Sequence, residues 1–395
     1  MTSHGGAWVV QTRDTARGIT GQVDVFDSLD VVLRHNRAGA FQLTVPADHA
    51  QRDLFTTGTG VIIWSPDADA PILSGQVRSL TETVTAASAT VTVTGVDDTA
   101  RLAARIVYPD PARTADDQTT DTNYTDTGAA GTVIRSLVDT QAGAGALAAR
   151  QTPGLSVNPD TALGETVGVN ARFSPLLDTV AALADTGGIG FRLIQWDADD
   201  GPIIDTTGTG TTDIRLQIYT PVDRSDRVRF TAASGALSGW QHALTAGTVT
   251  RAIVAGQGEG TARFIVELAD TSAETDWGER QELFIDARDT NDLDVLTQRG
   301  YEQFLTAGAA ASLQATPSAT GLLVFGRDWW LGDTVTMIVD SVTVTDAVST
   351  VAIKVTGDGE AVVTPTVGPD ATLTGPRIYA AVRALNRRIQ QLETI

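Results

Sequence analysis

The sequence predicts a mainly β protein with an α+β insertion in the middle of the chain. Short segments in which apolar and polar residues alternate recur towards both ends of the chain, and this period of two is typical of half-buried strands. Thr, Ala, Gly, Val and Asp dominate the composition, which favours strands joined by many turns. Between the two β-rich regions, helical and strand patterns follow each other, which indicates a mixed section.

Size and charge narrow the function classes. The 395 residues suffice for two or three domains. The net charge of −20 argues against a protein that grips nucleic acid or docks on anionic lipid. The chain has no cysteine, so disulfides and thiolate zinc sites are excluded. No apolar run reaches about 18 residues and the start lacks the features of a signal peptide, so stable membrane insertion is not expected.

The N-terminal region is predicted as strands with one short helix. Apolar residues alternate with polar ones over 23–25, 29–33 and 41–45, and further strands are expected over 61–64 and 72–84. Pro46-Ala-Asp48 is predicted to open a short helix that reaches Phe55, with Asp48 as its cap. This region therefore reads as a small β-domain.

The segment 91–111 is predicted to be a strand, a tight acidic turn, a short helix and a stiff exit. Val91, Val93 and Gly95 face one way along the strand, and a carboxylate of Asp97 or Asp98 can then cap the new helix. Two arginines and two apolar residues fall on opposite sides of that helix, Arg101 and Arg105 against Leu102 and Ile106. Tyr108-Pro109-Asp110-Pro111 ends it, because each proline holds its predecessor extended.

The middle of the chain is predicted as mixed α/β. Residues 112–127 are Thr, Asp and Asn with few apolar side chains, so we expect an exposed loop or linker. A short helix is expected over 132–138, and Ser174-Pro175 predicts the start of another helix that ends at Gly187-Gly188. Strands are expected over 190–196 and 213–219.

From Phe230 the pattern is β again, with one helix between Asp289 and Gly308 and a tight turn at Gly332-Asp333. A Pro/Gly/Thr linker over 365–376 precedes the last segment, 377–395. There the apolar residues are spaced four, three, four and three apart, as in a coiled-coil seam. The seam consists of Ile378, Val382, Leu385, Ile389 and Leu392, with Arg388 and Glu393 at positions that pair between chains.

No catalytic, cofactor-binding or metal-binding constellation is predicted. Gly256-Gln-Gly-Glu-Gly260 has its third glycine misplaced for a dinucleotide site, so a hairpin turn is favoured. Asp197–Gly201 lacks the later Glu of a calcium loop, and the four histidines are scattered. Asp97-Asp98 is explained by helix capping without acid–base chemistry. Trp329-Trp330 is assigned to a core or a subunit contact in preference to a sugar-binding platform.

Two segments carry a resemblance to a known family. The first holds Gly95, Asp97, Asp98, Arg101, Leu102, Arg105, Tyr108, Pro109 and Pro111, and the second holds Leu331, Gly332 and Asp333. They resemble a minor tail protein family of actinobacterial siphophages, which is similar to the trimeric tail-tip, or baseplate hub, proteins. The resemblance implies two β-barrel-like hub domains per chain and a non-enzymatic homotrimer that closes the tail tube. It also implies a location at the tail tip of the virion after assembly in the host cytoplasm.

The implied partners are the distal tail protein, the tape measure protein and a tail fibre or receptor-binding protein. DNA would pass through without specific binding, and no cofactor is implied. The alternatives are a distal tail ring or injection-machine hub protein, and a tail-associated cell-wall hydrolase. The expected organisation is a β-rich hub domain (1–112), a linker (113–127), a mixed α/β domain (128–229), a second β-rich hub domain with one helix (230–364), a linker (365–376) and an oligomerising helix (377–395).

Overall fold

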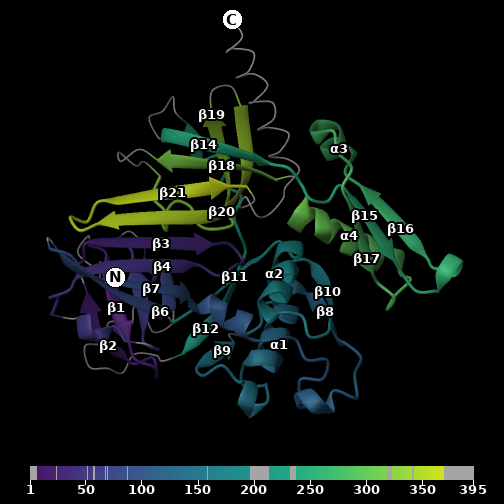
Figure 1. Cartoon of the computed structure of the whole chain (residues 1–395), viewed down its shortest axis with the longest axis horizontal. Helices are drawn as coiled ribbons and strands as arrows, with labels where there is room; N and C mark the ends of the chain where they lie inside the picture. The colour runs from purple at the N-terminus through teal and green to yellow at the C-terminus, as the bar shows by residue number, and fades with distance from the viewer. Residues whose placement is uncertain are drawn as a thin grey trace, which may run out of the picture. The chain divides into compact units, whose positions relative to one another are not determined.

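A computed structural model describes residues 7–368, apart from 24, 51, 57, 67, 69, 87, 158, 196–212, 232–236, 309, 318–322 and 340–341. The chain divides into two compact units. The first comprises Met1–Val222, Leu323–Asp333 and Thr350–Val363, and the second comprises Asp223–Leu322, Thr334–Ser349 and Thr364–Ile395. Figure 1 labels most of their strands and helices.

The first unit contains an antiparallel sheet, and in the order of strand pairing residues 350–356 of β20 come first. The other strands follow in the order β3, β4, β7, β6, β5, β1 and β2. Their bounds are β1 Val9–Arg13, β2 Ile19–Val23, β3 Ser28–Arg34, β4 Ala40–Pro46, β5 Gly60–Trp64, β6 Leu73–Val84, β7 Ala89–Asp97 and β20 Val342–Thr356.

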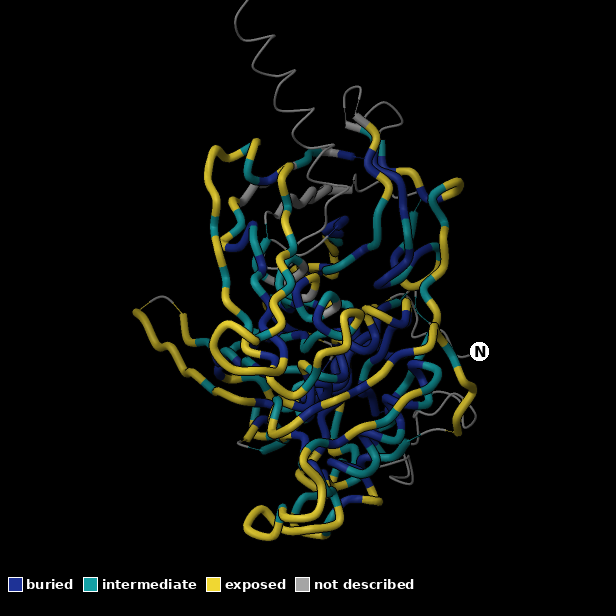
Figure 2. The backbone as a smooth tube through the Cα atoms, turned by 90° about the vertical axis from the view of Figure 1, so that its right-hand side faces the viewer, coloured by how far each residue is buried: buried dark blue, intermediate teal, exposed yellow. Residues whose placement is uncertain are grey.

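Alternation along the strands explains how this sheet buries one face. Leu29, Val31 and Leu33 of β3 are buried while the residues between them are not, and β4 repeats the pattern. The register places Leu29 opposite Leu43, so the buried side chains of both strands share a face. The far end of the β6–β7 hairpin is exposed and is drawn in yellow in Figure 2.

The rest of the first unit is the mixed α/β part that the sequence predicts. It contains a two-stranded sheet, a three-stranded sheet and two helices that pack against each other. Their bounds are β8 Tyr124–Ala129, α1 Ala130–Ala142, β9 Leu155–Val157, β10 Thr166–Ala171, α2 Leu176–Thr186, β11 Gly190–Ile194 and β12 Ile214–Tyr219. The apolar faces of α1 and α2 and the buried sides of both sheets form one continuous core, which also takes in Leu102 and Val107 of the 91–111 segment.

The second unit has two further sets of strands. β14 (Leu237–Thr245) pairs with β18 (Ala310–Pro317), which pairs with β21 (Ala361–Val367), all antiparallel. β13 (Arg229–Thr231) runs parallel to β19 (Thr334–Val339), which is antiparallel to residues 342–347 of β20. Buried Phe230, Val335 and Met337 belong to this second set.

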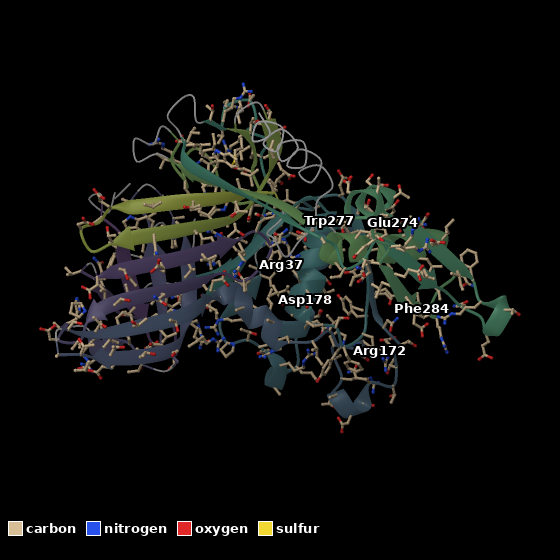
Figure 3. The ribbon with its side chains drawn as sticks, turned by 45° about the horizontal axis from the view of Figure 1, so that its top comes forward. Arg37, Arg172, Asp178, Glu274, Trp277 and Phe284 are labelled. Atoms are coloured by element: carbon tan, nitrogen blue, oxygen red, sulfur yellow. The ribbon has the colours of Figure 1, made fainter. Side chains whose placement is uncertain are left out.

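A small α/β module completes the second unit. β15 (Arg251–Ala255) lies between antiparallel β16 (Ile265–Ala269) and parallel β17 (Glu282–Asp286). α4 (Leu293–Ala307) covers one face of this sheet through Leu296, and α3 (Thr271–Trp277) connects β16 to β17. The other face leaves Phe284 exposed, and Trp277 is exposed at the end of α3; both are labelled in Figure 3.

The mainly β class with a mixed middle is confirmed, and several elements differ in detail. The helix expected after Asp48 is only a 3-10 turn, Arg52–Leu54, and the helix after Asp97 is also of the 3-10 type, Asp98–Ala104. Further 3-10 turns span Ala115–Asp117, Ala148–Arg150 and Gly260–Ala262. α1 extends beyond the expected 132–138, and α3 is a second helix in a region where only one was expected.

Two expected linkers contain strand residues. β8 begins at Tyr124, within the stretch 113–127 that the polar composition suggested was loop. β21 runs to Val367, past the expected start of the second linker at Pro365. The coiled-coil segment 377–395 lies outside the described residues.

Candidate functional site

The two adjacent aspartates of the first motif do different things. Asp97 caps the 3-10 helix, its Oδ1 accepting a hydrogen bond from the Ala100 N–H at 3.3 Å while its Oδ2 accepts from the Gly39 N–H at 2.8 Å. Asp98 is fully buried and points into the first unit instead. The prediction that capping explains both carboxylates is therefore correct for Asp97 and wrong for Asp98.

Asp98 is the centre of a buried charge network. Arg13 Nη2 and Arg101 Nε each donate to its Oδ1 at 2.8 Å, and Ser74 Oγ donates to its Oδ2 at 2.5 Å. Arg13 is itself only 1% exposed and also donates to the Gly75 carbonyl. A carboxylate that is shielded from solvent needs this many donors, because an unpaired buried charge strongly destabilises the folded state.

The network ties four elements together through Gln195. Arg13 Nη1 donates to Gln195 Oε1 at 2.6 Å, and the Gln195 N–H donates to Ser74 Oγ at 2.8 Å. Next to it, the Leu193 N–H donates to Thr99 Oγ1 at 3.2 Å. β1, β6, the 3-10 helix after Asp97 and the end of β11 thus converge on one carboxylate.

The surroundings of Asp98 keep it ionised. Burial on its own would raise the pKa of Asp98, but the positive charge and hydrogen bond of Arg13, the charge of Arg101 and the Ser74 hydroxyl together lower it to about 2. Since Asp98 is not exposed and its oxygens are already occupied, it cannot act as a general acid or base on a substrate.

Asp97 borders a small cavity of the first unit. Burial raises the pKa of Asp97 to about 7, against the effect of the hydrogen bond from the Gly39 backbone. The cavity has a volume of about 30 Å³, and its lining includes Arg192, Tyr219 and Trp330. This volume suits only a few water molecules and is far below that of a pocket for a substrate or an organic cofactor.

The second motif, Leu331-Gly332-Asp333, forms a tight turn that depends on the residue types at Gly332 and Asp333. Gly332 has φ +82, and a Cβ added there would lie 2.5 Å from Cε1 of His35. Asp333 is buried and accepts hydrogen bonds from the Trp330 N–H at 2.9 Å and the Val222 N–H at 2.8 Å. Burial lowers the pKa of His35, whose Nδ1 lies 3.3 Å from the Tyr219 hydroxyl, to about 4.

The tryptophan pair is packed against other rings. Trp329 is 2% exposed, with its ring centroid 5.0 Å from that of Phe325. Trp330 is stacked on Phe325 at 4.6 Å with an interplanar angle of 7°, and the Arg192 guanidinium lies 5.2 Å from the Trp330 ring centroid. These contacts agree with the core assignment and leave little ring surface for a sugar.

The remaining motif residues shape the exit of the 91–111 segment. Leu102 is fully buried in the core around α1 and α2. Arg105 Nε donates to the Arg150 carbonyl at 2.8 Å, and the backbone N–H and carbonyl of Tyr108 bond to the two ends of the Gln141 amide. Pro109 is buried, and Asp110 Oδ1 accepts from the Ala112 N–H.

The other sites considered from the sequence hold no cofactor pattern in the described residues. Gly256 and Gln257 exchange backbone hydrogen bonds with Phe264, as expected for the hairpin between β15 and β16. Among the residues described, no three His, Asp or Glu side chains lie together as a metal site would require. Asp197–Gly201 and all seven predicted oligomerisation residues, Ile378 to Glu393, lie outside the described residues.

Sequence reasoning missed several residues of the buried network. Arg13, Ser74 and Gln195 lie far apart in the chain and belong to no recognisable motif. The only signal for Arg13 is a charged residue at the end of the otherwise uncharged strand Val9–Arg13. Asn36 was also missed; it has φ +53 and donates through Nδ2 to Asp185 Oδ1 and the Ile189 carbonyl. The available signal was an Asn directly after a predicted strand, since Asn is one of the residue types that adopt positive φ.

Comparison with known proteins agrees with this architecture. The structure is similar to the 43 kDa tail protein of prophage MuSo2 from Shewanella oneidensis (TM-score 0.56, 13% identity, covering 93% of this chain and 99% of that one). It is also similar to a tail protein from Neisseria meningitidis MC58 (TM-score 0.54, 11% identity, 95% and 99% covered). A third similar structure is prophage tail protein gp18 from Listeria monocytogenes EGD-e (TM-score 0.51, 11% identity, 96% and 99% covered). No curated protein sequence matches the chain.

The chain therefore shares its fold with these tail proteins. Residues 9–369 match the model of the siphovirus ReqiPepy6 Gp37-like proteins, and the chain belongs to that family. This confirms the siphophage tail family indicated by the two motifs. In the described part of the chain, no helix has the length and apolar character needed to cross a membrane.

Proposed function

We propose that this protein is the hub at the tip of a siphophage tail, where three copies close the end of the tail tube. The observation that carries the proposal is the match of residues 9–369 to a siphovirus tail family, together with a fold shared over nearly the whole length of three tail proteins. The β-sheets at the two ends of the chain support two hub-type domains per subunit, which in a trimer would form a ring of six. Such a ring matches a six-fold tube.

The C-terminal segment supports association of parallel chains, although β-branched residues at a with Leu at d favour two strands in isolated peptides. Val382 and Ile389 fall at a positions of a heptad, and Leu385 falls at d. Arg388 at g and Glu393 at the following e are spaced to pair between parallel chains. About two and a half heptads are too short to set their own oligomer number, so the ring would impose three strands on the bundle.

The acidic composition supports a role in a tube that passes DNA. Phosphate contacts from Lys and Arg supply most non-specific DNA affinity, and a chain of net charge −20 opposes such contacts. The proposed neighbours are the distal tail protein above, the tape measure protein inside and a fibre or receptor-binding protein below. The protein would be a structural component of the virion that needs no cofactor.

Mass photometry of the purified chain tests the oligomeric state. The proposal predicts trimers, in equilibrium with monomers at low concentration. A stable hexamer would favour the distal tail ring instead. Zymography on host cell walls tests the hydrolase alternative, for which the proposal predicts no clearing.

The seam is tested by Leu385→Asp, which would place three carboxylates in a dry interface. We expect the variant to keep its fold and to assemble tails that lack the component mounted on the helix. Gln391→Asp, at a c position outside the seam, is the matched control and should behave as the wild type. Normal infectious tails from Leu385→Asp would show that the helix is only a tether.

A further inference from the structure

Two aromatic rings and two arginines contact one another in a row in the first unit. The Arg150 guanidinium lies 3.5 Å from the centroid of the Tyr108 ring, and Tyr108 contacts Phe173 edge to face at 5.9 Å. Arg172, labelled in Figure 3, places its guanidinium 5.1 Å from the Phe173 ring centroid. Arg105 joins this group by donating to the Arg150 carbonyl. We call these five residues the arginine–aromatic patch.

The backbone holds the patch in a fixed shape. The Phe173 N–H donates to the Val107 carbonyl, and the Val107 N–H donates to the Ser174 carbonyl. Phe173 itself has φ +54, a left-handed conformation that is unfavourable for a bulky residue. Phe173 is nevertheless 39% exposed, and neighbouring Ile106 is 41% exposed. Strain of this kind persists where the surrounding structure enforces it, and it is frequent at functional surfaces.

The three arginines of the patch have no carboxylate partner among the described residues. Arg105 donates only to backbone carbonyls, Arg150 donates to the Gln141 side chain and the Ile106 carbonyl, and Arg172 donates to the Thr122 carbonyl. Elsewhere, arginines such as Arg13, Arg251 and Arg299 do form ion pairs with carboxylates. Three guanidinium groups that form no ion pair within the described residues thus gather in a chain whose net charge is −20.

We propose that the arginine–aromatic patch is a docking surface for an acidic segment of another tail protein. Guanidinium groups held against rings are partly desolvated and preorganised, so they form strong bidentate hydrogen bonds with carboxylates. The exposed Phe173 ring and the exposed aliphatic side chain of Ile106 add apolar contact beside the charges. A nucleic acid fits less well, because Arg150 already covers a face of Tyr108 that a base would use and the net charge repels the phosphates. This inference does not depend on the number of copies in the tail.

Fluorescence anisotropy with the full chain and a labelled oligoglutamate peptide tests the proposal, with oligolysine and oligothymidine as comparison probes. The wild type is expected to bind oligoglutamate, and more weakly as salt rises. Arg172→Gln should weaken this binding roughly tenfold, the loss expected for one charge-assisted hydrogen bond. Arg78→Gln, an exposed arginine elsewhere in the same unit, is the matched control and should leave the affinity unchanged.

Phe173→Gly removes a ring while allowing the left-handed backbone, so it should weaken peptide binding without loss of fold. Circular dichroism of each variant checks the fold independently. Equal affinity of wild type and Arg172→Gln for oligoglutamate, or no binding by either, would overturn the proposal. Tighter binding of oligothymidine that is lost in Arg172→Gln would make the patch a nucleic-acid site and would also overturn it.

Discussion

The two units each contain an arginine–carboxylate network, and the two networks differ in their access to water. In the first unit, the Arg13 and Asp98 side chains are 2% and 0% exposed. In the second, Arg251 donates to both Glu274 oxygens at 2.7 and 2.8 Å, but these side chains are 20% and 18% exposed, and Glu267 on the same arginine is 46% exposed. The hydrogen-bond lengths are similar, but the ion pairs of the second network stabilise the fold less, because water and salt screen their charges.

The apolar core near the first network is also larger than the core near the second. The α/β part of the first unit packs both its helices and two sheets into one large cluster, whereas the module of α4 and β15–β17 buries a small group, Ala252, Val254, Ala287 and Leu296. A buried charge is tolerated where packing excludes water and supplies donors. We therefore expect the first network to act as a structural requirement and the second as a surface feature.

Removal of the buried carboxylate should have the largest effect. Asp98→Ala leaves Arg13 as an unpaired buried cation, and it should lower the free energy of unfolding by about 3–5 kcal/mol, measured by urea denaturation. Asp178→Ala, on the exposed side of α2 and labelled in Figure 3, is the matched control and should cost less than about 1 kcal/mol. Similar losses in the two variants would show that the buried network does not stabilise the fold as described.

A methyl group at Gly95 should have the next largest effect. Its Cβ would lie 2.3 Å from Cζ of Phe41 and 2.4 Å from the Gln76 carbonyl oxygen, so β7 or its neighbours must shift. Gly95→Ala should lower the free energy of unfolding by about 1–3 kcal/mol. Gly168→Ala in β10 is a fair control, because its nearest contact is 3.6 Å away at Thr127 Oγ1. Equal thermal stability of the two variants would contradict the close packing of β4, β6 and β7.

The two motif aspartates predict opposite effects of pH. The pKa of Asp98 is lowered to about 2, so its stabilisation is present above about pH 3.8 and is lost as the pH falls towards 2. The pKa of Asp97 is raised to about 7, so the folded state keeps a proton that the unfolded state has released. The free energy of unfolding should therefore fall as the pH rises from about 3.8 to 7.

Asp97→Asn separates the two effects, because the amide oxygen can still accept a hydrogen bond but does not titrate. Relative to the wild type, the variant should gain roughly 1–3 kcal/mol of stability between pH 4 and pH 7 and nothing further above pH 8. Denaturation series at these three pH values measure the difference. A constant difference across the range would show that Asp97 titrates as an ordinary exposed carboxylate.

The exposed network should give the smallest effect. Glu274→Gln should shift the melting temperature by only about 1–2 °C, and the shift should shrink in 1 M salt. The shift caused by Asp98→Ala should persist in salt. A salt-resistant, large shift for Glu274→Gln would remove the contrast between the two networks.

The sequence predicts local elements well where one physical signal dominates. Alternation at Leu29–Leu33 identified β3, and the Ser174-Pro175 start and Gly187-Gly188 end identified α2. It missed α3, whose seven residues have one buried apolar side chain, Ala273, and so no visible helical stripe. The polar stretch 113–127 concealed the start of β8, because this strand is half exposed and, among the described strands, pairs with β10 alone.

The candidate site was predictable only in part. The motif segments around Asp98 and Gly332 were visible in the sequence, and residue type and position predicted a cap at Asp97 or Asp98, of which the structure shows Asp97. The partners Arg13, Ser74 and Gln195 depend on contacts between residues 24 to 182 positions apart, which no local pattern encodes. The unpaired state of Arg105, Arg150 and Arg172 likewise depends on which carboxylates the fold leaves at a distance.

Cryo-electron microscopy of the assembled tail tip tests the central claim most directly. A reconstruction without imposed symmetry should place three copies of this chain around the tail axis, each contributing two β-rich domains to one ring below the distal tail protein. Six equivalent copies in that ring, or a position along the tube away from the tip, would contradict the account.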